Sequence, residues 1–185
     1  MPLKKHPTIG CCGIDCGLCP RYYTAGGSRC PGCGGEGFDD AHPPCGVKKC
    51  CAGNHGLEAC GQCAAYPCQR YEDREKMERD SFVTHKRMYR NHEKIKADGI
   101  ERFMAEQGVR VSILKDLLAN FDDGRAKGFY CLSAALLSPE KMRSAMAGTL
   151  VEAASKDDKK IKAKALRAAF QGIAEAEGVE LKLLI

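Results

Sequence analysis

The 185-residue sequence predicts a small, irregular, cysteine-rich domain over residues 1–70, followed by a mostly α-helical domain over residues 71–185 that ends in a short strand. Of the 13 cysteines, all but Cys131 lie between Cys11 and Cys68, where Gly, Pro and Cys dominate and no helical or strand period is visible. Beyond Arg70, Gly and Pro become sparse and apolar residues recur at helical spacing. Because the first stretch cannot build a hydrophobic core, it needs other staples to fold.

Apolar spacing and capping residues divide the second domain into helices. They predict helices over 71–97, 100–107, 109–121 and 127–137, one that begins at Ser138-Pro139, and one that runs from Asp157 or Asp158 to Gly178. Gly108 is expected to end the second of these helices. Ser138-Pro139 joins an N-cap residue to a proline at the first helical position.

The last residues alternate apolar and polar side chains, from Val179 to Leu183, which predicts a short closing strand. A strand needs a partner. Val109-Arg110-Val111 is one candidate within the chain. Another copy of the protein is the second candidate, which would form a homodimer through the C-terminal strand.

The composition also bears on location. No apolar run reaches the roughly 18 residues of a membrane span, and Met1 to Gly10 lack an apolar signal core. We therefore expect a cytoplasmic protein whose thiols stay reduced. An odd number of cysteines also fits poorly with a closed set of disulfides, the rival interpretation for a secreted protein.

The cysteine spacings predict metal binding. The clusters are C-x3-C-x2-C at Cys12, Cys16 and Cys19, C-x2-C at Cys30 and Cys33, C-x4-C at Cys45 and Cys50, and C-x2-C-x4-C at Cys60, Cys63 and Cys68. Two residues between cysteines let both sulfurs reach one ion, and the Pro and Gly of Cys30-Pro31-Gly32-Cys33-Gly34 suit the turn of a zinc knuckle. His42 precedes Cys45 at the spacing by which Cys60 precedes Cys63, so it is a candidate imidazole ligand.

Eleven candidate donors follow: Cys12, Cys16, Cys19, Cys30, Cys33, His42, Cys45, Cys50, Cys60, Cys63 and Cys68. They suffice for two four-ligand zinc sites, and a third site needs Cys51, Cys11 or His55 as a twelfth donor. Adjacent cysteines rarely bind the same ion, so we expect Cys11 and Cys51 to be spare. Each zinc held by four thiolates adds about −2 to the formal charge, so the net charge of +5 need not indicate a nucleic-acid partner.

The motifs resemble a known family. Cys12-Gly-Ile-Asp-Cys-Gly-Leu-Cys-Pro20, the Cys30–Cys33 knuckle, the Cys45–Cys50 stretch and Cys60-Gly-Gln-Cys-Ala-Ala-Tyr-Pro-Cys68 are similar to the uncharacterised bacterial and archaeal family catalogued as domain of unknown function 3795. The resemblance covers residues 11 to about 75 and implies zinc ligands more than an activity. The chain differs from the family pattern at His42, where relatives usually have Cys, and it lacks a C-terminal zinc-ribbon pair.

The preferred function is a set of mainly structural zinc sites that support a helical domain for an unknown partner or ligand. Thiolate-saturated zinc has no open position for chemistry, so catalysis is not expected. The first alternative is an iron–sulfur protein for electron transfer or sensing, although the ferredoxin pattern is absent. The second is a zinc knuckle that binds nucleic acid, for which Arg21-Tyr22-Tyr23 is the basic and aromatic group of the first domain. A third is an enzyme acting at Cys131, with His85 or His92 as its base.

Overall fold

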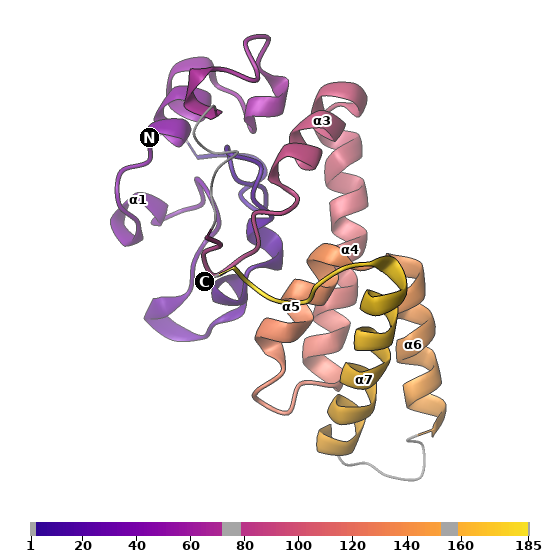
Figure 1. Cartoon of the computed structure of the whole chain (residues 1–185). Helices are drawn as coiled ribbons and strands as arrows, with labels where there is room; N and C mark the ends of the chain where they lie inside the picture. The colour runs from indigo at the N-terminus through magenta and orange to yellow at the C-terminus, as the bar shows by residue number, and fades with distance from the viewer. Residues whose placement is uncertain (1–2, 72–78, 153–158, 185) are drawn as a thin grey trace. The chain divides into compact units, whose positions relative to one another are not determined.

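The computed structural model describes residues 3–71, 79–152 and 159–184 (Figure 1). The chain divides into two compact units. The cysteine-rich unit comprises Met1–Gln107 with Leu183–Ile185, and the helical unit comprises Gly108–Lys182.

The cysteine-rich unit contains only short helical turns before its first long helix. These are the 3-10 turns η1 (Cys16–Leu18), η2 (Pro20–Tyr23), η3 (Gly26–Ser28), η5 (Cys60–Gln62) and η6 (Gln69–Tyr71), the α-helical turns α1 (Phe38–Ala41) and α2 (Gly46–Lys48), and the π-helical turn η4 (Lys49–Asn54). Loops with local backbone hydrogen bonds join them, such as Gly10 N–H to the Ile14 carbonyl at 2.8 Å. The turns therefore depend on packing with one another, since none is long enough to be stable alone.

Two longer helices complete this unit, α3 (Met88–Asp98) and the first residues of α4 (Ile100–Asn120). Ile95 of α3 and Phe103 of α4 are buried with Ile9 and Ala59 in a small core. This core fixes the short turn η5 against α3.

Gly61 of η5 allows that close contact. A Cβ atom at this position would lie 2.7 Å from the His92 carbonyl oxygen and 3.0 Å from the Ile95 Cβ. We expect Gly61→Ala to lower the free energy of unfolding by about 1–3 kcal/mol because backbone must move to make room. Urea unfolding measures the change.

Gly27 provides the matched control, since a Cβ there would meet nothing within 4 Å. Gly27→Ala should change stability by no more than about 0.5 kcal/mol. Equal stability of the two variants would contradict the packing of η5 on α3.

The predicted helix over 71–97 is wrong over much of its length. The helix α3 begins only at Met88, and residues 72–78 lie outside the described residues. Residues 79–87 are not helical, and there the Asp80 carboxylate accepts hydrogen bonds from the His85 N–H at 2.7 Å and the Leu184 N–H at 3.0 Å. A side chain that satisfies backbone N–H groups in this way competes with the helix.

The predicted break at Gly108 is also wrong, because α4 continues through it from Ile100 to Asn120. An exposed glycine inside a helix costs about 1 kcal/mol. Phe103 and Gln107 before it and Ile113, Leu114 and Leu117 after it are all buried. Their packing outweighs that cost.

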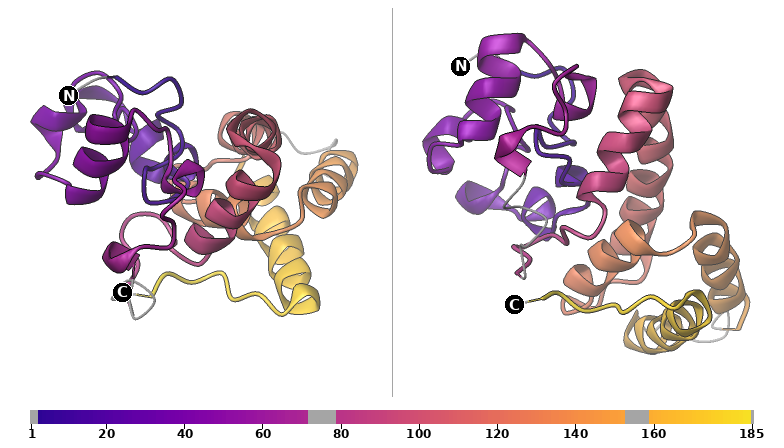
Figure 2. Two further views of the ribbon diagram at one scale, coloured as in Figure 1. Left: turned by 90° about the horizontal axis from the view of Figure 1, so that it is seen from above. Right: turned by 45° about the horizontal axis from the view of Figure 1, so that its top comes forward.

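In the helical unit, α4 is followed by α5 (Lys127–Leu136), α6 (Pro139–Glu152) and α7 (Lys159–Glu177). The predictions of a mostly helical second half and of a helix end at Gly178, which has φ +64°, are confirmed. Helices α6 and α7 lie side by side in both views of Figure 2 and contact each other. The predicted caps Asp157 and Asp158 lie outside the described residues.

The core of the helical unit is aliphatic and aromatic. Tyr130 and Phe170 pack edge to face with ring centroids 6.3 Å apart, among the buried residues Leu114, Leu117, Phe121, Leu137, Met142 and Leu166. Arg110 donates hydrogen bonds to the carbonyls of Ala134 at 2.7 Å and Leu137 at 2.8 Å, which caps the end of α5. This unit therefore has a hydrophobic core of its own, built from side chains of α4 to α7.

The predicted C-terminal strand is wrong. The described residues 3–71, 79–152 and 159–184 contain no strand, and 179–184 are extended without a sheet partner in that part of the chain. Val109-Arg110-Val111 cannot pair with them because these residues belong to helix α4. The tail is held by Asp80, whose N–H donates to the Leu184 carbonyl at 2.5 Å. The expectation of a homodimer through this strand thereby loses its basis.

Candidate metal centre

All eleven predicted donors lie in the cysteine-rich unit, and all thirteen cysteines are free thiols. Cys19 and Cys33 are buried, and the other donor cysteines are partly buried. Reduced cysteine is the form that can bind metal, which it does as the thiolate. Among the residues described, however, no three His, Cys, Asp or Glu side chains meet closely enough to form a coordination shell.

One group of donors consists of Cys16 and Cys19 of the C-x3-C-x2-C motif with Cys30 and His42. The Cys30 Sγ lies 3.3 Å from the His42 Nε2, and the thiols of Cys19 and Cys16 both interact electrostatically with Cys30. The backbone N–H groups of Arg21 and Tyr22 are directed at the Cys19 sulfur. N–H groups directed at a sulfur favour the thiolate, which is the form that binds a metal.

The imidazole of His42 is held in place by a ring contact. It stacks on Phe38 with centroids 4.3 Å apart and an angle of 15° between the planes. Burial, with the nearby positive charge of Arg21, lowers the pKa of His42 below its usual value. The neutral imidazole, which is the form that binds a metal, is therefore favoured near pH 7.

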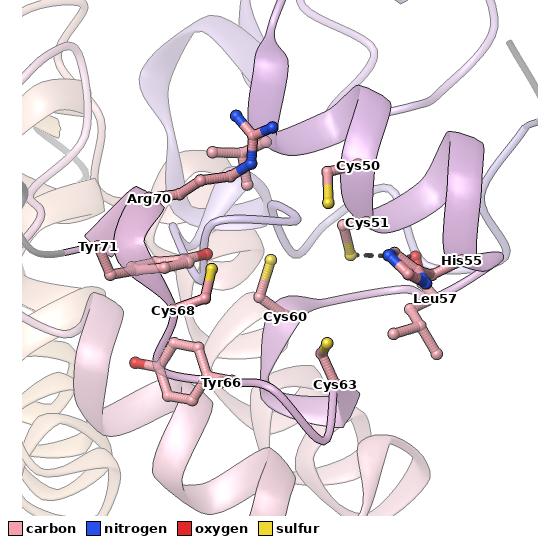
Figure 3. A pocket seen from close by; sticks show the side chains of 11 residues that line it. Cys50, Cys51, His55, Leu57, Cys60, Cys63, Tyr66, Cys68, Arg70 and Tyr71 are labelled. Atoms are coloured by element: carbon pink, nitrogen blue, oxygen red, sulfur yellow. Dashed lines mark hydrogen bonds between the residues drawn. The ribbon is translucent and has the colours of Figure 1, made fainter.

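A second group of donors lines a cavity of about 30 Å³ (Figure 3). Its wall includes the side chains Cys50, Cys51, His55, Cys60, Cys63 and Cys68. The sulfurs of Cys50 and Cys51 point from η4 toward those of the C-x2-C-x4-C motif. A cavity of this size accommodates a single water-sized species.

Local backbone bonds set the positions of that motif. The Cys63 N–H donates to the Cys60 carbonyl at 2.9 Å, which closes η5, and the Tyr71 N–H donates to the Cys68 carbonyl at 2.8 Å, which opens η6. The spacing of the three cysteines therefore corresponds to two consecutive turns that face one cavity. Cys45, by contrast, packs on a neighbouring buried cluster and does not line this cavity.

The predicted spare cysteines, Cys11 and Cys51, lie between the two groups. Both are buried, with 1% and 3% of their surface exposed. The Cys11 thiol interacts with the thiols of Cys33 and Cys51, and Cys51 interacts in turn with Cys60. The Cys11 N–H also lies 3.5 Å from the Cys33 sulfur. The sulfurs thus form a continuous series from one group of donors to the other.

Two buried lysines lie close to this series, and the sequence patterns did not reveal them. Lys4 donates to the Ile9 carbonyl at 2.5 Å, and Lys48 donates to the Asp39 carboxylate at 2.5 Å. Hydrogen bonds from Cys33 and Cys51, aided by the charges of both lysines, hold the pKa of Cys11 well below its ordinary value. Burial and neighbouring thiols raise the pKa of Cys16, Cys33 and Cys51, so within this series the lowered pKa belongs to Cys11.

Asp15, another residue that the sequence patterns did not single out, attaches the C-x3-C-x2-C motif to α3 and α4. Asp15 is 1% exposed. Its Oδ1 accepts hydrogen bonds from the Asn91 amide at 3.0 Å and from the Gln107 amide, and its Oδ2 lies 3.5 Å from the Arg87 Nε. The position of this carboxylate between the two cysteines of a C-x3-C motif was the one sequence feature that could have indicated its structural role.

His92, proposed as a catalytic base, is occupied structurally. Its Nδ1 accepts a hydrogen bond from the Gly61 N–H at 3.0 Å, and its Nε2 lies 3.2 Å from the Tyr71 hydroxyl. Burial lowers the pKa of His92 to about 4. Cys131 is 2% exposed in the core of the helical unit. Neither group is open to a substrate.

No protein-family model, curated protein or solved structure matches the chain. None of the described helices is long and apolar enough to cross a membrane. The resemblance to domain of unknown function 3795 stays a prediction.

Proposed function

We propose that the cysteine-rich unit binds two or three zinc ions in closed sites that stabilise its fold. The observation that carries this proposal is the 30 Å³ cavity lined by five thiols and the His55 imidazole. The second support is the Cys30–His42 pair with its neighbouring thiols. The motif resemblance to a cysteine-rich family points to the same ligands.

The two groups suggest how the donors are shared. Cys16, Cys19, Cys30 and His42 would hold one ion, and Cys50, Cys60, Cys63 and Cys68 would hold another. Sulfur and imidazole nitrogen are the usual donors of structural zinc sites. Cys11, Cys12, Cys33, Cys45 and Cys51 remain for a third ion.

Charge balance favours the same account. Four thiolates around Zn²⁺ carry a net charge of about −2, which must be compensated when buried. Lys4, buried near the sulfurs, supplies one such positive charge, and Lys48 supplies another that it shares with Asp39. Zinc sites with four protein ligands stabilise the fold without catalysing a reaction.

We expect the helical unit to bind the partner or ligand, and we expect the protein to do so in the cytoplasm.

An iron–sulfur cluster is the second candidate, because the same thiols would ligate iron. Visible absorbance after anaerobic purification distinguishes the two, since zinc thiolates are colourless.

The proposal predicts which cysteine replacements affect the metal. Cys63→Ser should remove about one ion per chain, or release it to a chelator far more readily, because it breaks a four-ligand shell. Metal content per chain after titration with a colorimetric chelator measures the effect. Cys131→Ser should leave the metal content unchanged, because Cys131 belongs to the helical unit. Equal metal content together with equal release to the chelator in both variants would refute the assignment of Cys63.

A further inference from the structure

A cluster of arginine and aromatic side chains lies on the cysteine-rich unit outside the donor groups. We refer to Arg21, Tyr22, Tyr23, Arg29 and Phe82 as the stacked patch. The Arg21 guanidinium carbon lies 4.9 Å from the Phe82 ring centroid, and that of Arg29 lies 5.7 Å from the Tyr22 centroid. Tyr22 and Tyr23 meet edge to face with centroids 5.4 Å apart. The patch therefore brings together residues 21–29, which lie between the donors Cys19 and Cys30, and Phe82, which lies about sixty residues later in the sequence.

The backbone under the patch is fixed by hydrogen bonds. The Cys30 N–H donates to the Arg21 carbonyl at 2.9 Å, and the Arg21 guanidinium donates to the Ser28 carbonyl at 3.4 Å. The Tyr23 hydroxyl donates to the Gly17 carbonyl at 2.7 Å. The side chains are therefore presented on a constrained loop, which lowers the entropy cost of binding a ligand.

The exposure and charge of the patch indicate the chemistry of its ligand. Phe82 is 59% exposed, which is unusual for a phenylalanine ring. No Asp or Glu occurs between Asp15 and Glu36, so Arg21 and Arg29 have no acidic partner in their own segment. Among the described residues 79–87 around Phe82, Asp80 is the one acid, and its carboxylate accepts the His85 and Leu184 N–H groups. A ligand with flat rings and negative charge would stack on the exposed aromatic ring and pair with the two arginines.

We propose that the stacked patch binds single-stranded nucleic acid. Bases would stack on Phe82 and Tyr22, and phosphates would pair with Arg21 and Arg29. Base–aromatic stacking of this kind accepts any base, because every base offers a π face, and arginine adds a cation–π contribution. This site is a function in addition to zinc binding, because the zinc ions would only stabilise the fold on which the stacked patch lies.

The test is fluorescence anisotropy of the full-length protein with labelled uridine and thymidine dodecamers at about 50 mM salt. We expect binding of at least one of the two, with an affinity that falls as salt rises. Phe82→Ala and Arg29→Ala should each weaken binding about tenfold. Both side chains are exposed, so the variants should fold normally. The RNA and DNA arms show whether the 2′-hydroxyl contributes.

Leu3→Ala and Arg102→Ala are the matched controls, since they remove an exposed apolar side chain and an exposed arginine elsewhere in the same unit. Both should bind as the unmodified chain does. The proposal would be overturned if the protein bound neither dodecamer at low salt, or if its affinity did not fall as salt rises. Equal losses of affinity in the patch and control variants would also overturn it. Metal content measured on the same samples separates this failure from a failure of the zinc proposal.

Discussion

Removal of the metal is expected to unfold the cysteine-rich unit while the helical unit stays folded. Structural zinc sites contribute apparent free energies of about 10–16 kcal/mol, comparable to or larger than the whole stability of an ordinary domain. The turns η1 to η6 have no other staple of that strength, since their cysteines form no disulfides and their apolar core centres on few residues such as Ile9 and Ala59.

Hydrogen exchange read by mass spectrometry measures this loss in the full-length chain. After addition of a strong chelator, peptides from residues 8–71 should lose protection. Peptides from α5 and α7 should keep theirs, because Tyr130, Leu166 and Phe170 form an independent core. Restored protection on adding zinc is the control for irreversible damage. Unchanged exchange in residues 8–71 without metal would contradict the proposed role of the sites.

Asp15→Ala should destabilise the cysteine-rich unit by about 3–5 kcal/mol. The substitution leaves Arg87 without its buried counter-charge and removes an acceptor from the amides of Asn91 and Gln107. Breaking a buried ion pair from one side has a cost of this size. Urea unfolding of the zinc-loaded protein, followed by circular dichroism, measures it.

Two further variants make that prediction specific. Asp15→Asn keeps an oxygen acceptor but loses the charge, so its loss of stability should be intermediate. Asp98→Ala removes an exposed carboxylate at the end of α3 and should change stability by no more than about 0.5 kcal/mol. If Asp15→Ala matched Asp98→Ala, the C-x3-C-x2-C motif would not depend on its attachment to α3 and α4.

The sequence predicted the helical second half well where periodicity and caps agreed. The helices at Lys127 and Pro139 begin where expected, because a proline or an apolar stripe defines them locally. The sequence-based predictions were wrong where tertiary contacts determine the secondary structure. Gly108 continues a helix because its flanks are buried, and the alternating residues 179–183 make no strand because their candidate partner is helical.

The cysteine spacings predicted one grouping that the structure shows and nothing of what surrounds the thiols. Spacing alone groups Cys60, Cys63 and Cys68, which do line one cavity. No local pattern could show that Cys11 and Cys51 lie buried between the groups, or that Lys4 and Lys48 lie near them. Those positions result from contacts between residues far apart in the sequence.

Elemental analysis of the purified protein, combined with an absorbance spectrum taken without oxygen, tests the central claim most directly. We predict two or three zinc ions per chain, no iron and no visible absorbance. Fewer than one zinc ion per chain in folded protein would contradict the claim, and so would stoichiometric iron with a brown colour.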